Sequence, residues 1–288
     1  MKINYKPAFR IHFPILLFFM AWSVAVAQTN SASQNQKAPS IQDNSFLMEE
    51  AYNQEPGVVQ HINGFMKSLR GSGWVYSFTQ EWPVFGQKHQ FSYTLPIQRV
   101  NASPTALTGL GDIALNYRYQ LVGDGEAKVA ISPRFSVLLP TGDREKGLGL
   151  GTVGVQVNLP VSVVISDKVV THWNAGATYL PSAKNSLSEK ANLKGFNLGQ
   201  STIWLVKPSL NLMLETVWNR FESVAGRSLR DHENSWLVSP GVRWAYNFES
   251  GLQIVPGIAV PIGVGPSRGD VSLFVYLSFE HPFGRKKK

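Results

Sequence analysis

Long stretches of this chain alternate between apolar and polar residues with a period of two, and this pattern constrains the fold most. In residues 113–121, Leu115 and Tyr117 share one face while Asn116 and Arg118 share the other. Successive side chains of a β-strand point to opposite faces, so the alternation indicates strands with one apolar and one polar face. The pattern predicts strands at 74–84, 89–100, 112–122, 128–139, 151–165, 169–180, 196–206, 210–222, 235–248, 251–263 and 271–283.

The lengths of these strands and of their connections favour a membrane barrel over a soluble β-sandwich. Several predicted strands are longer than the strands of soluble proteins, which have about five or six residues. They reach the roughly 9 to 11 residues that a strand needs to cross a membrane. Short and long connections alternate, which is typical of outer-membrane barrels with short periplasmic turns and long outer loops. The short ones are 85–88, 123–127, 166–168, 207–209 and 249–250, and the long ones are 101–111, 140–150, 181–195, 223–234 and 264–270.

The number of strands follows from parity. Bacterial single-chain barrels have an even number of strands, so residues 58–66, although poorly alternating, are the candidate for a twelfth. We therefore expect an all-β fold, a transmembrane antiparallel up-and-down β-barrel of about twelve strands, over residues 46–284. Ten strands, or a short segment within 46–66 that plugs the barrel, are the alternatives. Prolines inside the predicted strands should cause bulges or bends at Pro96, Pro133, Pro160, Pro240, Pro256 and Pro261.

Both ends of the chain carry signals of their own. A basic start, an apolar run over 11–27 and a small-x-small exit at Ala25-Val26-Ala27 predict a secretory signal peptide at 1–27. Residues 28–45 are rich in Ser, Asn and Gln and are expected to form a disordered leader. A basic tail, 285–288, follows the barrel. The net charge of +8 is therefore concentrated at the ends, which argues against nucleic-acid binding. A secretory signal followed by a barrel pattern predicts an outer-membrane location.

Charged and polar side chains on the inward face are the candidates for lining the lumen. Carboxylates and arginines on that face either line a pore or pair with each other across it, because buried charges need partners. The chain has no cysteine, and its histidines lack metal-site spacing, so we expect no metal, no cofactor and no enzymatic activity. The candidates are Glu81, Asn116, Arg118, Arg134, Gln156, His172, Glu215, Arg243 and Glu280.

Three glycine-punctuated motifs carry a family resemblance. They are Gly109-Leu110-Gly111-Asp112, Leu139-Pro140-Thr141-Gly142-Asp143 and Lys146-Gly147-Leu148-Gly149-Leu150-Gly151. The region resembles the outer-membrane family labelled "MetA-pathway of phenol degradation". The resemblance implies a β-barrel and a transport role linked, in some members, to aromatic catabolism. It implies no catalytic residue.

These observations leave three functional hypotheses. The first is a porin-like outer-membrane channel for passive passage of small solutes, aromatic or hydrophobic ones among them. The second is a closed barrel with a structural or surface-binding role and no transport, and the third is an outer-membrane enzyme. The partners we expect are outer-membrane lipid, the barrel assembly machinery and a small-molecule solute, with no nucleic acid.

The mature protein should begin near Gln28, because the small residues at Ala25 and Ala27 form a signal-peptidase site. N-terminal sequencing of protein extracted from outer membranes measures this directly. Recovery of a chain that still begins at Met1 would contradict the prediction.

Overall fold

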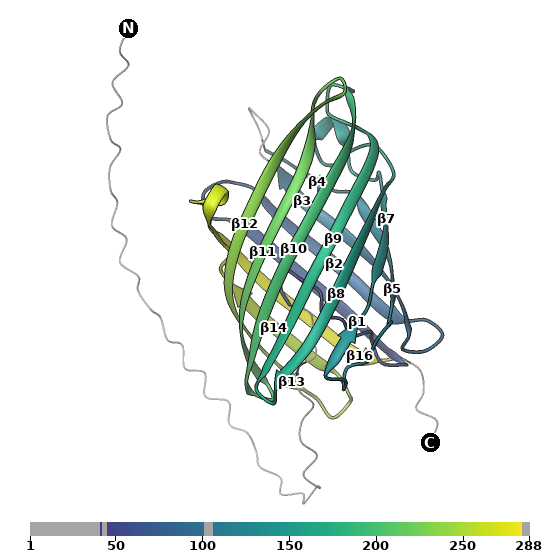
Figure 1. The fold of residues 1–288 in the computed structure, drawn as a ribbon, viewed down its shortest axis with the longest axis vertical. Helices are drawn as coiled ribbons and strands as arrows, with labels where there is room; N and C mark the ends of the chain where they lie inside the picture. The colour runs from purple at the N-terminus through teal and green to yellow at the C-terminus, as the bar shows by residue number, and fades with distance from the viewer. Residues whose placement is uncertain (1–40, 42–44, 101–105, 284–288) are drawn as a thin grey trace, which may run out of the picture. The chain divides into compact units, whose positions relative to one another are not determined.

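The computed structural model describes residue 41, residues 45–100 and residues 106–283 (Figure 1). The predicted signal peptide, most of the predicted leader and the basic tail lie outside the described residues. No helix among the described residues is long and apolar enough to cross a membrane.

The described chain is almost entirely β-structure, with two short 3₁₀ helices at η1 (Arg144–Lys146) and η2 (Gly265–Ser267). The strands are β1 (Val58–Ser68), β2 (Trp74–Pro83), β3 (His89–Val100), β4 (Leu107–Leu110), β5 (Ile113–Tyr119), β6 (Val129–Ile131), β7 (Arg134–Leu139), β8 (Gly154–Ser166), β9 (Val169–Lys184), β10 (Lys190–Lys207), β11 (Leu210–Gly226), β12 (Leu229–Trp244), β13 (Tyr246–Asn247), β14 (Gln253–Ala259), β15 (Ile262–Gly263) and β16 (Ser272–Pro282).

The sheet closes on itself, because β1 pairs with β16 along its whole length, from Val58 opposite Pro282 to Ser68 opposite Ser272. Every other pairing joins neighbours in sequence and is antiparallel. β4 and β5, β6 and β7, β12 and β13, and β14 and β15 are each two parts of one strand. The sixteen segments therefore form the predicted up-and-down barrel of twelve strands. The candidate twelfth strand at 58–66 is confirmed as β1.

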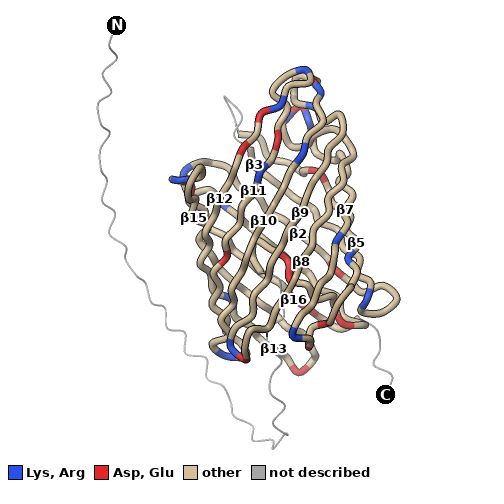
Figure 2. The backbone as a smooth tube through the Cα atoms, in the orientation of Figure 1, with Lys and Arg blue, Asp and Glu red and all other residues tan. Residues whose placement is uncertain are grey.

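The two faces of the wall differ in polarity as the alternation predicts. Along β8, Val155, Val157 and Leu159 are 38–51% exposed, whereas Asn158 and Ser162 are buried. The apolar side chains therefore lie on the outside and the polar ones inside, the reverse of a soluble barrel. An apolar band on the outer surface is what lipid requires. Figure 2 shows that charged residues gather mainly at the two ends of the barrel.

Three of the four interruptions within the described strands lie at a proline or opposite one. β6 and β7 are separated around Pro133, and β14 and β15 around Pro261, as expected. Pro96, Pro160 and Pro240 stay inside strands, but each faces an interruption in the neighbouring strand. The backbone N–H groups of Gly111, Ser132 and Val260 donate to the carbonyls of these three prolines. A proline cannot return that hydrogen bond, so the ladder opens on the partner strand instead.

Two of the predicted long loops are wrong. Residues 181–195 and 223–234 were expected to be loops, yet only 185–189 separate β9 from β10, and only 227–228 separate β11 from β12. In these residues the outward face becomes polar, so the alternation that predicts strands stops. The inward face stays apolar, because Leu180, Ala183, Ala191 and Leu193 pack together. The strict alternation of short and long connections therefore fails at 227–228.

Both ends of the barrel wall meet at one rim, since the N–H of Phe283 donates to the carbonyl of Gly57 at 2.7 Å. The turns at 167–168 and 208–209 lie at this rim, and the taller hairpins of β9–β12 rise at the other. Short turns mark the periplasmic side of such barrels. The tall hairpins therefore face the outside.

Leu115→Arg should destabilise the barrel by about 2 to 4 kcal/mol, the cost of Arg on the lipid face at mid-depth. Ala114→Arg is the matched control, since Ala114 is the adjacent residue and lines the lumen. The folded fraction of each variant in urea, read from its heat-modifiable gel mobility, measures the difference. Equal losses for both variants would contradict the assignment of the two faces.

Candidate functional site

Residues 45–55, just before the first strand, lie inside the barrel. Ser45, Glu50, Ala51 and Asn53 are each at most 4% exposed. The sequence predicts the boundary between the leader and the barrel at residues 45 and 46, with a plug formed by part of 46–66 as an alternative. The structure combines two of the possibilities, since 45–55 fill part of the lumen and β1 completes the twelve-stranded wall. We call residues 45–55 the luminal segment.

The luminal segment is held mainly through its backbone. The amide N–H groups of every second residue from Leu47 to Asn53, and that of Gln54, donate to side chains of the wall. The bonds run from Leu47 to Glu215 (3.0 Å), Glu49 to Asn174 (3.2 Å), Ala51 to Ser162 (2.8 Å), Asn53 to Gln120 (2.9 Å) and Gln54 to Gln90 (2.7 Å).

Two wall amides bind this backbone as a neighbouring strand would. Asn174 accepts the N–H of Glu49 and donates from Nδ2 to the carbonyl of the same residue at 2.7 Å. Gln120 accepts the N–H of Asn53 and donates to the carbonyl of Ala51 at 2.7 Å. The inward polar row therefore satisfies backbone groups that would otherwise be buried without partners.

Arg118 is the strongest anchor of the luminal segment. Its Nε donates to Oδ1 of Asn53 at 2.9 Å, and its terminal nitrogens donate to the carbonyls of Glu50 and Tyr52. The guanidinium also lies 3.7 Å from the carboxylate of Glu81. This pairing of Glu81 with Arg118 is one of the two outcomes left open for the inward charges.

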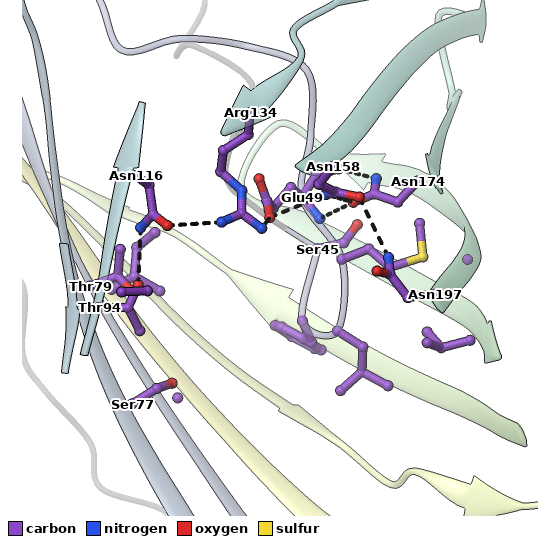
Figure 3. Close-up of a pocket in the computed structure, with 18 of the residues that line it drawn as sticks. Ser45, Glu49, Ser77, Thr79, Thr94, Asn116, Arg134, Asn158, Asn174 and Asn197 are labelled. Atoms are coloured by element: carbon purple, nitrogen blue, oxygen red, sulfur yellow. Dashed lines mark hydrogen bonds and ion pairs between the residues drawn. The ribbon is translucent and has the colours of Figure 1, made fainter. Parts of the chain in front are cut away.

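Arg134 forms a second anchor, with a carboxylate that the sequence did not single out. Its guanidinium lies 2.8 Å from Glu49 of the luminal segment and donates to Asn116 at 2.9 Å (Figure 3). It also donates to Gln156 at 2.9 Å. Glu49 precedes the first alternating strand, so no periodic signal placed it inside. The resulting network joins three of the predicted inward residues to the segment.

Of the remaining predicted residues, His172, Glu215 and Arg243 are buried and Glu280 is half-buried. Glu215 and Arg243 are at most 1% exposed, and Oε2 of Glu215 has no hydrogen-bond partner among the described residues. His172 shares a 2.7 Å hydrogen bond with Ser162 and meets the ring of Tyr52 edge-on. Glu280 accepts a hydrogen bond from Gln60 at 2.7 Å.

Glycines in the wall make room for the apolar start of the luminal segment. The Phe46 ring lies against Gly241 and Gly257, where a β-carbon on either residue would collide with it. The same ring packs against Phe274 and Tyr276, with centroids 5.6 and 5.2 Å away. These contacts close one side of the lumen with an apolar cluster.

The luminal segment separates two cavities. The larger cavity, of about 530 Å³, has residues 45–49 along one side and side chains of the barrel wall around the rest. The smaller, of about 150 Å³, is lined by Ile41 and by turn residues Gly125 and Asp167 at the periplasmic rim. The lining of the larger cavity combines amides and hydroxyls, charged groups and apolar side chains, and Figure 3 labels most of the polar and charged ones. The amides and hydroxyls include Asn116, Asn158, Asn174, Asn197, Ser77, Thr79 and Thr94, the charged groups are Glu49, Glu81 and Arg134, and the apolar side chains include Phe46, Leu47, Ile62, Met66, Phe274 and Tyr276.

The described residues hold no group of three or more His, Cys, Asp or Glu side chains that could bind a metal ion. No protein-family model matches the chain, and no curated protein matches it.

Among solved structures, the chain is similar to an outer membrane channel from Pseudomonas putida F1, with 15% identity and a TM-score of 0.57. The match covers 81% of this chain and 98% of that one. The NanC porin (7% identity, TM-score 0.48) and the KdgM porin (8% identity, TM-score 0.46) each match 79% of this chain and 100% and 99% of their own. At these identities the first similarity establishes the barrel fold alone. The fold and its apolar exterior place the chain in the outer membrane.

Arg118→Gln should loosen the luminal segment. Hydrogen bonds to charged groups contribute about 1.5 to 3 kcal/mol each, so local opening should become at least about tenfold more frequent. A single cysteine placed at the buried Ala51, in this chain without cysteine, reports the opening through its rate of reaction with a thiol reagent.

Arg99→Gln in the same Ala51→Cys protein is the matched control, since Arg99 is exposed at the opposite rim, where it lies across from Trp74 of β2. An unchanged labelling rate in the folded Arg118→Gln protein would show that Arg118 does not hold the segment.

Proposed function

We propose that the chain is a channel through which small solutes cross the outer membrane passively, along the barrel lumen. The observation that carries the proposal is the division of the lumen. A cavity of about 530 Å³ is separated from the periplasmic rim by the chain's own segment, held by side chains of the wall. The barrier is therefore the chain's own segment, which hydrogen bonds from the wall and the packing of Phe46 hold in place.

The width of the wall supports this proposal. About eight strands leave an interior that side chains just fill, and about sixteen leave an aqueous channel. Twelve strands enclose an intermediate space, and here the luminal segment occupies part of it. Withdrawal of residues 45–55 would join the two cavities along the barrel axis.

The lining of the larger cavity suits small solutes with an aromatic ring and a polar substituent. Phe274 and Tyr276 contribute aromatic rings to this lining, and Asn116 and Asn158 contribute amide groups. Sites of this kind combine an apolar surface with a few polar groups that orient the solute. The resemblance to the phenol-degradation family favours the same class of solute.

One observation favours the second candidate, a closed barrel with a structural or surface-binding role. The three hydrogen bonds from Arg118 and the ion pair between Arg134 and Glu49 hold the segment firmly. A barrel that never releases the segment would carry no solute.

Deletion of residues 45–54 should raise the conductance in planar bilayers severalfold over the wild type, because the lumen would lose its only described barrier. In the deleted channel Arg134 loses its partner Glu49, so the lumen should favour anions. Arg134→Gln in that background should shift the preference toward cations, since charged side chains in a narrow passage set ion selectivity.

Gel mobility before and after heating shows whether the deletion variant is folded. A folded deletion variant that conducts no ions, and that takes up neither phenol nor a sugar into liposomes, would establish the closed-barrel role. Faster uptake of phenol than of a sugar would support the aromatic class of solute, and the reverse order would contradict it.

A further inference from the structure

The tall hairpins of β9–β12 carry a sharp boundary on their outward face. Leu198 lies opposite Trp218, and Trp218 lies opposite Trp236, so three large apolar side chains form one row across β10, β11 and β12. Trp side chains concentrate where hydrocarbon meets lipid head groups. This row therefore marks the outer edge of the hydrocarbon layer.

Basic residues follow directly beyond that row. Arg220 lies opposite Phe196 on the same outward face, and Lys194 lies two residues further along β10. Arg230 lies opposite Val224, further toward the tip. All three, and Lys190 on the same face of β10, are exposed. We call Lys190, Lys194, Arg220 and Arg230 the outer basic cluster.

The acidic residues of the same strands lie on the inward face, with one exception. Glu233 lies opposite Phe221, which lines the large cavity, so Glu233 and Asp231 point to the inner side. Among the described residues of β9–β12, Glu222 is the one carboxylate on the outward face. It pairs with Arg230 at 3.7 Å and accepts the N–H of Lys194 at 2.9 Å. The outward face therefore keeps a net positive charge.

The spacing suits a phosphate group. Side chains on neighbouring strands lie within about 5 to 8 Å of one another, and long Lys and Arg side chains can converge from such positions. Arginine binds phosphate with two parallel hydrogen bonds, and lysine adds a point charge. At the depth of the head groups, beside apolar rings that contact acyl chains, the phosphate within reach belongs to a lipid.

We propose that the outer basic cluster binds the phosphate groups of a phosphorylated glycolipid in the outer leaflet of the membrane. This binding does not depend on solute transport. It would fix the tall hairpins against the lipid surface and set the height of the barrel in the membrane.

The test compares two triple variants of the mature protein in detergent, each titrated with lipid A that carries phosphates and with the dephosphorylated form. K194Q/R220Q/R230Q removes the cluster. K128Q/K168Q/K207Q removes three exposed basic residues at the periplasmic rim and is the control. Binding is read from the rise in the temperature at which the heat-modifiable gel band unfolds.

The wild type and the control should bind the phosphorylated lipid equally well, and the cluster variant should bind it roughly a hundredfold more weakly. This follows because each basic residue near a charged lipid surface contributes about fivefold. R220Q alone, which removes one exposed charge, should weaken binding about fivefold and serves if the triple variant does not fold. Equal binding by both triple variants, or equal binding of the two lipid forms by the wild type, would overturn the proposal. Protection by free phosphate alone at the same concentration would also overturn it.

Discussion

Every backbone N–H and C=O group of a chain in hydrocarbon must find its partner within the protein, and the rest of this structure depends on that constraint. No water is present to bond an open edge, so the sheet has to close. The pairing of β1 with β16 meets this need. The same constraint explains why Pro96, Pro160 and Pro240 face interruptions in neighbouring strands. Proline has no N–H to donate, and opposite an interruption no carbonyl of the ladder depends on that donor.

Inside the barrel the constraint has a second consequence. An outward face that satisfies lipid forces polar side chains inward, because the strand alternates strictly. Twelve strands also leave space between opposite walls of the barrel. The luminal segment fills part of the space and presents N–H and C=O groups at every second residue, which Asn174 and Gln120 bond as a strand would. The polar interior and the inserted backbone thus stabilise each other.

Much of this architecture could be predicted from the sequence, because period-2 alternation reports which face each residue takes. Asn116, Arg118 and Glu215 were placed inward for that reason, and all three are buried. The luminal segment could not be placed, since it lacks the alternating pattern and many of its contacts are made by backbone groups that every residue carries. Glu49 was missed with it. The tall hairpins were missed for another reason, since outside the lipid only the inward face, through Leu180 and Leu193, keeps the apolar pattern.

The binding of the luminal segment has a consequence for any solute that passes. The amides that line the larger cavity, among them Asn116, Asn158 and Asn174, also hold the luminal segment or Arg134. A solute can shift the equilibrium between the bound and the released luminal segment only if its affinity differs between these two states. A molecule with one ring and one hydroxyl replaces few of the hydrogen bonds made by eleven residues of backbone, so it cannot displace them. For such solutes the rate of passage would follow from how often the segment releases on its own, and the charges of the lumen would select only among the molecules present at that moment.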